Sequence, residues 1–399
     1  MKSLLVSGIF PPHIGGSGRW LWELYSRLPL DLYTIVAGQH PSAAAFDQTH
    51  GLDIHRLPLA FADLGYFDWA GYCRYRSISG EVAKLVRTRS DGAIHCGALL
   101  PDAWIGRLVA RKFGLPLLVY MHGEETCYAN ASRQLDWMGR RILRDAAAVI
   151  ANSENTASIL RNRWNVGDDR IHVLNPGVDC AKFAPVERDS AVRHRLGWED
   201  RKVVLTVGRL QERKGQDMMI RALPKILQNV PDVLYAIVGD GDDFARLDGL
   251  ARGLGVADRV RFHRDLADND LVRCYQQCDL FALPNRQVGD DIEGFGMVLL
   301  EAQACGKPVL AGASGGTAET MRPGETGALV DCTTPHLLAA KIAELLRDSL
   351  RRDQMGLAAR QWVTSRFDWP VLAAEAGEIH GGILADTRRP HTTRAKASP

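Results

Sequence analysis

The sequence predicts an α/β protein made of two doubly wound, Rossmann-like domains that face each other across a cleft. Short apolar runs without polar alternation recur between longer helical patterns, which is typical of parallel strands buried on both faces. The series restarts near residue 202, after a loop-rich stretch that contains Pro176, Gly177 and Pro185. At 399 residues the chain is also long for a single core.

Eight apolar runs are predicted as strands, and several of them end in Gly, His or Asn. They are 3–10, 31–38, 116–123, 147–153, 202–210, 233–241, 279–285 and 307–312. Ligands bind at the carboxyl ends of strands in open α/β sheets, so these polar ends are candidate site positions.

The restart places the domain boundary near residue 180. We expect a first domain over 1–180 and a second over 181–370. A helix at about 371–385 is expected to pack back onto the first domain. The basic tail at 386–399 is predicted to be disordered.

Composition excludes some classes of function. The net charge is only +2 with 24% charged residues, so the basic stripe typical of nucleic-acid binding is absent and no nucleic-acid partner is expected. The apolar run at 3–10 is too short to span a membrane and no small-residue cleavage site follows it. We therefore expect a cytoplasmic protein, at most peripheral on the inner face of a membrane. The eight cysteines lack paired metal-ligand spacing, so buried reduced thiols are expected.

The segment "IEGFGMVLLEAQACGKPVLAG" combines a glycine loop, a helix and a strand. Gly294 and Gly296 allow close approach of the backbone to a ligand. A helix that begins near Met297 directs its positive end at that loop, which suits a phosphate. Glu293 and Glu301, separated by seven residues, lie at fixed sequence positions on either side of this expected phosphate site.

The spacing of these two glutamates argues against glycoside hydrolysis. On one helix it would separate them by roughly 12 Å, whereas retaining glycosidases need carboxyl groups about 5–5.5 Å apart and inverting ones about 6.5–9.5 Å. The pair is better placed to hold two ends of one ligand, although two solvated glutamates remain the simpler alternative.

The strand at the restart continues into "VGRLQERKGQD". Gly208 permits close backbone approach, and Arg209 and Lys214 flank a loop that leads into a helix capped near Asp217. Two cations at such a loop suit a diphosphate leaving group, which gains charge as its bond to a sugar breaks. Solvated loop cations are the alternative.

The first domain offers a second glycine loop and a histidine. Gly15, Gly16 and Gly18 follow the first strand without the GxGxxG spacing of a dinucleotide site. We interpret them as a loop over phosphate or acceptor, with a tight turn as the alternative. His122 ends a strand, where it is expected to line the cleft unless it is a structural histidine.

Three further patterns have competing interpretations. "GASGG" at 312–316 fits the GxSxG of an α/β-hydrolase, with Ser314 as nucleophile and Asp331 and His336 after it. The triplets at 240–242 and 268–270 resemble DxD metal motifs but are more typical of turns. Residues 61–78 combine aromatic side chains with arginines, which can mark an interfacial helix or an ordinary packed one.

As a set, "GRLQERKG", "EGFGMVLLEAQACGKPVLAG" and "SGGTAE" make the chain resemble the retaining glycosyltransferases of family 4, which have the GT-B fold. With "MHGEE" and "LPNR", it looks most like the mannosyltransferases that glycosylate phosphatidylinositol and similar lipids. The resemblance covers almost the whole chain. It implies that the domain at 1–180 binds the acceptor and that the domain at 181–370 binds the donor.

The resemblance implies a nucleotide-sugar donor, with GDP-mannose favoured over UDP-hexoses, and a sugar, lipid-linked or small-molecule acceptor. It implies front-face displacement, in which the leaving phosphate assists deprotonation of the acceptor, without a metal or other cofactor. An epimerase or hydrolase of the same fold is the alternative.

The resemblance also implies roles for individual residues, with His122, Glu293, Arg209 and Lys214 as the catalytic set. Arg209 and Lys214 would hold the diphosphate, Glu301 the ribose, and Glu293 the transferred sugar, with His122 at the reacting sugar. The remaining donor-binding positions are Gly15, Gly16, Gly208, Arg264, Gly294, Phe295, Gly296, Met297 and Val298. Arg264 stands where the family often has Gly, Asn285 where Ser is usual, and Glu124 where a second histidine is expected.

Overall fold

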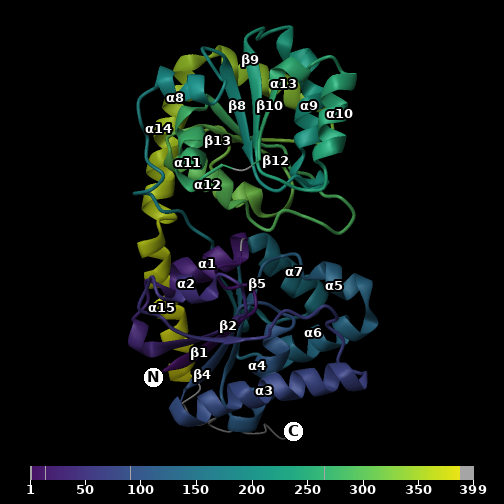
Figure 1. Cartoon of the computed structure of the whole chain (residues 1–399), viewed down its shortest axis with the longest axis vertical. Helices are drawn as coiled ribbons and strands as arrows, with labels where there is room; N and C mark the ends of the chain where they lie inside the picture. Colours follow the sequence, from purple (N-terminus) through teal and green to yellow (C-terminus); the bar gives the residue numbers. More distant parts are fainter. Residues whose placement is uncertain (1, 14, 90, 265, 387–399) are drawn as a thin grey trace, which may run out of the picture. The chain divides into compact units, whose positions relative to one another are not determined.

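The computed structural model describes residues 2–13, 15–89, 91–264 and 266–386. The chain separates into two compact units (Figure 1). Among the described residues, unit 1 comprises those within 2–151, 157–174 and 373–386, and unit 2 comprises those within 152–156 and 175–372. Most of the tail that we expected to be disordered, from residue 387 onward, lies outside the described residues.

Unit 1 contains a seven-stranded parallel sheet in the order β3-β2-β1-β4-β5-β6-β7. Its strands are β1 (Ser3–Ser7), β2 (Tyr33–Gly38), β3 (Asp53–Leu57), β4 (Ala93–Cys96), β5 (Leu117–Met121), β6 (Ala148–Ala151) and β7 (Ile171–Val173). Its helices are α1 (Gly16–Tyr25), α2 (Ala43–Asp47), α3 (Trp69–Arg89), α4 (Asp102–Phe113), α5 (Thr126–Ala131), α6 (Arg133–Asp145) and most of α7 (Glu154–Trp164).

Unit 2 contains a six-stranded parallel sheet in the order β10-β9-β8-β11-β12-β13. Its strands are β8 (Lys202–Val207), β9 (Val233–Val238), β10 (Val260–His263), β11 (Leu280–Leu283), β12 (Val309–Gly312) and β13 (Gly327–Val330). Its helices are α8 (Ser190–Arg195), α9 (Gln216–Leu227), α10 (Phe244–Gly253), α11 (Asp268–Gln277), α12 (Met297–Ala304), α13 (Pro335–Arg347) and α14 (Ser349–Arg366), with short 3-10 turns η3 (Glu212–Lys214) and η5 (Gly315–Thr320).

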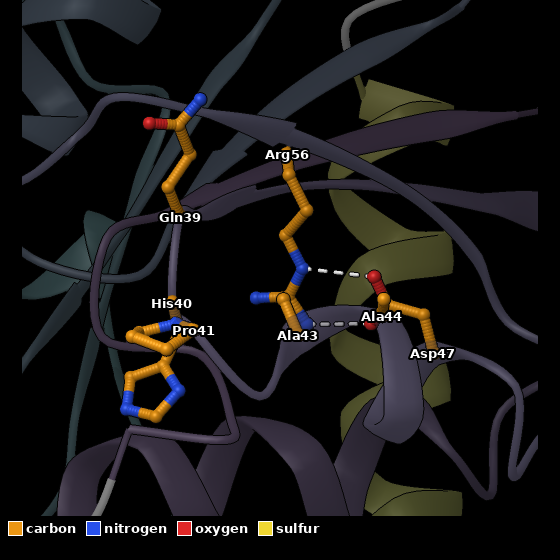
Figure 2. Close-up of a pocket in the computed structure, with 7 residues that line it drawn as sticks. All are labelled: Gln39, His40, Pro41, Ala43, Ala44, Asp47 and Arg56. Carbon is orange, nitrogen blue, oxygen red and sulfur yellow. Dashed lines mark hydrogen bonds and ion pairs between the residues drawn. The ribbon is translucent and has the colours of Figure 1, made fainter.

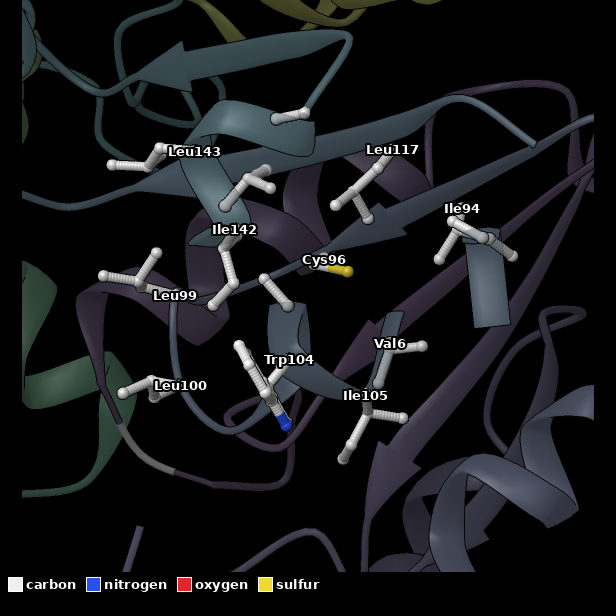
Figure 3. Close-up of a cluster of buried hydrophobic side chains, with 14 of the residues drawn as sticks. Val6, Ile94, Cys96, Leu99, Leu100, Trp104, Ile105, Leu117, Ile142 and Leu143 are labelled. Carbon is white, nitrogen blue, oxygen red and sulfur yellow. The ribbon is translucent and has the colours of Figure 1, made fainter. Parts of the chain in front are cut away.

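Both sheets are covered by helices on both faces, as the continuous apolar strands predicted. In β8, Val203 and Leu205 belong to one core cluster and Val204 belongs to another, because successive side chains point to opposite faces. In unit 1, Trp104 of α4 is fully buried against Val6 and Ile94 of the sheet (Figure 3). The α/β class with two parallel sheets is therefore confirmed.

The last helix, α15 (Trp369–Asp386), contributes to both units. Its start clusters with unit 2, where the Trp369 amide donates to the Val178 carbonyl at 3.3 Å. From residue 373 onward it clusters with unit 1, where His380 contacts the hydroxyl groups of Tyr33 and Tyr120.

Candidate active site

The glycine loop of unit 2 leads into α12, which begins at Met297 as predicted. Gly296 is the residue before the helix and has φ of 97°, a left-handed conformation that L side chains rarely adopt. The first N–H groups of a helix have no partner within it, and its dipole makes this end positive. The loop and helix start therefore form a seat suited to a phosphate.

Glu293, in the loop before this helix, forms ion pairs with two cationic side chains. Its carboxylate contacts Lys214 Nζ at 2.6 Å and also the Arg213 guanidinium. Glu293 is only 8% exposed. Burial alone would raise its pKa, but Lys214 and Arg213 outweigh burial and hold the pKa below its usual range. Glu293 is therefore ionised at neutral pH.

Arg213 is a residue of this site that the sequence analysis did not single out. Its Nε lies 3.0 Å from Asp291, and its carbonyl accepts from the Arg286 amide at 2.9 Å. Three charged residues stand in a row at Glu212–Lys214, and no sequence pattern shows that Arg213 contacts Glu293 together with Lys214.

The segment "LPNR" ties the loop to neighbouring elements. Arg286 donates to both carboxylate oxygens of Asp217, at 2.9 and 3.0 Å. Asp217 is therefore not the cap of α9 that we expected, because Gly215 occupies that position. The Asn285 side chain accepts from the Gly312 amide and donates to the Ser314 carbonyl, which joins the ends of β11 and β12.

The "GASGG" segment supports the glutamate loop through its backbone. The Gly316 amide donates to the Glu293 carbonyl at 3.0 Å. A Cβ added to Gly315 would lie 2.0 Å from that carbonyl oxygen, so this close approach requires glycine. The nearby Asp331 carboxylate accepts from the amide and hydroxyl of Thr333, which accounts for that residue without a hydrolase triad.

Glu301 has a different environment from Glu293. It lies within α12, is 4% exposed, and accepts a 2.5 Å hydrogen bond from the Tyr275 hydroxyl. One glutamate is thus held by two cations and the other by a phenol. This arrangement suits two ligand-holding groups better than an acid and a base that share a proton.

The remaining donor-site candidates of unit 2 follow β8 and its neighbours. A Cβ added to Gly208 would lie 3.8 Å from Lys214 Cε, and the adjacent Arg209 carbonyl accepts from Gln216. Arg264, after β10, pairs with Asp240 at 2.8 Å and stacks over the Phe244 ring at 4.4 Å. Because these strands are parallel and adjacent in the order β10-β9-β8-β11, the residues that follow them lie at the same carboxyl end of the sheet.

His122 in unit 1 is buried at the end of β5. Its Nε2 lies 2.6 Å from the Gly97 carbonyl, which can only accept, so Nε2 carries a proton. The ring packs edge-on against Trp20 at 5.5 Å. The Glu125 carboxylate accepts from the amides of His122 and Gly123, at 2.6 and 2.8 Å, and burial raises its pKa. Glu124, where the family resemblance predicts a histidine, is exposed.

In the first glycine loop of unit 1, one glycine is required by close packing and another faces open space among the described residues. α1 begins at Gly16, with Gly15 before it. A Cβ on Gly18 would lie 2.0 Å from the Ile9 carbonyl oxygen, so Gly18 serves packing. A Cβ on Gly15 would meet none of the described atoms within 4 Å, so this position is open to a ligand.

A pocket of about 540 Å³ in unit 1 was not predicted from the sequence (Figure 2). Arg56 on its wall pairs with Asp47 at 2.6 Å and donates to the carbonyls of Gly38 and Pro11. These partners occupy the guanidinium, so Arg56 joins three segments of the unit rather than presenting an open anion site.

The described residues contain neither a metal-binding group nor a membrane-spanning helix. No three His, Cys, Asp or Glu side chains among them form a metal-binding group. Within the two triplets considered as DxD motifs, Asp240 pairs with Arg264 and Asp268 lies 3.4 Å from Lys182. In the described part of the chain, every helix is too short or too polar to cross a membrane.

Two family models match the chain, one in each half. Residues 14–182 match Glycosyltransferase Family 4, and residues 189–362 match Glycosyl transferases group 1.

Curated relatives are about one-third identical to this chain. A GDP-mannose-dependent alpha-(1-6)-phosphatidylinositol monomannoside mannosyltransferase of Mycolicibacterium smegmatis is 33% identical, with 95% of this chain and 98% of the relative covered. A D-inositol 3-phosphate glycosyltransferase of Salinispora tropica is 32% identical, with 71% and 62% covered.

Solved structures share the fold at lower identity. Anabaena HepE in complex with UDP has a TM-score of 0.80 at 24% identity, with 96% of this chain and 100% of that one covered. Sucrose-phosphate synthase from Thermosynechococcus elongatus has a TM-score of 0.78 at 23% identity, with 97% and 100% covered. The chain therefore belongs to the group 1, or family 4, glycosyltransferases of the GT-B fold, and it is a retaining glycosyltransferase.

Proposed function

We propose that this protein transfers mannose from GDP-mannose to a lipid-linked acceptor. The observation that carries the proposal is the group of two cations around buried Glu293 beside the N-terminus of α12. The relatives named as GDP-mannose-dependent mannosyltransferases support the choice of donor, since they align over nearly the whole chain.

In this proposal unit 2 binds the donor. Lys214 and Arg209 neutralise the diphosphate, and the amides from Gly294 to Val298 contact the donor from the helix end. Glu301 binds the ribose, and Arg264 lies beside the base. Glu293 holds hydroxyl groups of the mannose.

Unit 1 provides the acceptor side of the reaction. His122, with its tautomer fixed by Gly97, contacts the reacting sugar, and Gly15 and Gly16 let the backbone approach the phosphate or acceptor. The domain roles at 1–180 and 181–370 are part of the same proposal.

The chemistry is a displacement on the face from which the diphosphate leaves. The bond from the sugar C1 to the diphosphate oxygen breaks, and the acceptor hydroxyl oxygen bonds to C1 on the same face. The departing phosphate takes the hydroxyl proton. Positive charge for the leaving group comes from Lys214 and Arg209, so we propose that no metal is needed.

Donor choice is directly testable by thermal unfolding. GDP and GDP-mannose at 100 times their Kd should stabilise the folded protein by about 2.7 kcal/mol, whereas UDP-glucose at equal concentration should shift the melting temperature little. A larger shift with UDP-sugars would contradict the choice of base. Rapid consumption of GDP-mannose without any acceptor would instead indicate a hydrolase or epimerase.

We also propose that the protein contacts the inner face of a membrane through an aromatic patch on unit 1. The patch consists of Phe67, Trp69, Tyr72 and Trp137, which are 64%, 78%, 37% and 37% exposed. Phe67 lies 5.1 Å from Trp137, and Trp69 stacks on Tyr72 at 5.8 Å. Arg76 and Arg141 lie over the Tyr72 and Trp137 rings. Aromatic side chains with adjacent cations suit an anionic lipid surface.

Replacing Phe67 and Trp69 by serine should weaken binding to vesicles that contain phosphatidylglycerol by about tenfold or more, since burying such a side chain is worth about 1.5–3 kcal/mol. Vesicle sedimentation measures this. The matched control replaces Leu350 and Leu357 of unit 2 by serine, because these leucines are 68% and 67% exposed. Equal losses in both double variants would show that the patch has no special role.

A further inference from the structure

We infer that Arg213 is a positioning residue, which keeps the Glu293 carboxylate aimed at the sugar when the donor diphosphate engages Lys214. This inference rests on the proposed donor role of the site. It adds a residue that neither the sequence motifs nor the comparisons assign.

The two cations that pair with Glu293 differ in how firmly other contacts fix them. The Arg213 guanidinium contacts Glu293 through one terminal nitrogen and Asp291 through Nε, so two carboxylates fix its plane. Its backbone is fixed as well, because its carbonyl accepts from the Arg286 amide. Lys214 reaches Glu293 with an ammonium group on a flexible stem, which can turn toward another anion.

A diphosphate changes the balance of charge at this site. The structure places two cations, Arg213 and Lys214, beside two carboxylates, Glu293 and Asp291. The donor adds at least two negative charges at the α12 end. Lys214 is the mobile cation and turns toward them, whereas Arg213 stays between its two carboxylates.

Without Arg213, a buried carboxylate would face new negative charge with a shared lysine as its cation. From η5, the Gly316 amide donates to the Glu293 backbone carbonyl and not to its carboxylate. Asp291, from the same loop, adds negative charge. Glu293 would then take up a proton more readily or turn away from the sugar.

The test compares Arg213→Ala and Arg213→Lys with wild type and with Arg252→Ala. Arg252 is a matched control because it lies on α10, is exposed, and pairs with Asp248 on the same helix. The measurements are kcat and KM for GDP-mannose, the Kd of GDP, the melting temperature, and kcat between pH 5 and pH 8.

We expect Arg213→Ala to lower kcat by about 10²-fold, the usual effect of misplacing a reacting geometry by about 1 Å. The Kd of GDP should stay within about threefold of wild type, because GDP has no sugar for Glu293 to hold. Arg213→Lys should recover part of kcat. The loss of activity as pH falls should begin at higher pH in Arg213→Ala, since Glu293 must be ionised and loses a cation that lowers its pKa.

Two results would overturn the inference. The first is an Arg213→Ala variant with wild-type kcat and an unmoved acid limb. The second is a parallel loss of GDP binding and melting temperature, which would make Arg213 a structural residue. A wild-type protein that uses UDP-glucose instead of GDP-mannose would contradict the donor proposal alone, and the same ratios measured with UDP and UDP-glucose would then decide the role of Arg213.

Discussion

Lys214→Ala should lower the rate of sugar transfer by about 10²–10³-fold while the protein stays folded. Removing one group that stabilises charge developing in a transition state typically has this effect. The Lys214 ammonium lies 2.6 Å from Glu293 beside the start of α12. Because the diphosphate gains charge as the C1–O bond breaks, kcat should fall more than donor affinity.

Folding should survive the substitution, because Arg213 still faces the buried carboxylate of Glu293. Lys225→Ala is the matched control, since it removes an exposed lysine from α9 of the same unit. The measurements are steady-state kinetics and the melting temperature of both variants. A Lys214→Ala protein that keeps more than about half of wild-type kcat would rule out this role for Lys214.

The sequence predicted interior strands well and edge strands poorly. All eight predicted runs contain strands of the structure. The four edge strands, β3, β7, β10 and β13, were not named. In β3 and β10, polar side chains such as those of Asp53 and Arg261 interrupt the apolar run, as an edge position allows. Interior β4 was missed because His95 interrupts its apolar residues.

The candidate site was predicted where motifs fix spacing and was missed where contacts depend on the tertiary fold. The start of α12 at Met297 follows from Gly296 and the apolar run after it. The contact between Lys214 and Glu293 joins residues far apart in the chain, and only the β8–β11 pairing brings their loops together. Arg213 shares that geometry and had no motif of its own.

A buried network in unit 1 also had no sequence signature. His380 of α15 shares hydrogen bonds with Tyr33 at 3.0 Å and Tyr120 at 2.9 Å. The His95 ring lies 4.5 Å from it, and His95 itself contacts the Tyr25 hydroxyl at 2.7 Å. These side chains come from β2, β5, β4 and α1, and every one of them is uncharged at neutral pH.

Lowering the pH from 7 to 5 should destabilise unit 1 through His380 by about 2 kcal/mol, with about 4 kcal/mol reached near pH 3. Burial lowers the pKa of His380 from 6.5 to about 3. The unfolded chain therefore binds a proton that the folded one excludes. Stability is fully present above pH 6.5 and falls as the pH drops toward 3. Thermal unfolding at pH 7 and pH 5 measures the change.

His380→Gln separates this effect from general acid denaturation. Glutamine cannot titrate, and it can still hydrogen-bond one of the two tyrosines. Because a buried tyrosine hydroxyl can lose its partner, the variant should be less stable at pH 7 by about 1–3 kcal/mol. It should also lose less stability than wild type between pH 7 and pH 5. His95 remains and its pKa is also lowered by burial, so some pH dependence should persist. His336→Gln removes an exposed histidine of α13 and should leave the wild-type pH dependence intact. If His380→Gln and His336→Gln lose equal stability on acidification, then proton exclusion at His380 does not account for the loss of stability at low pH.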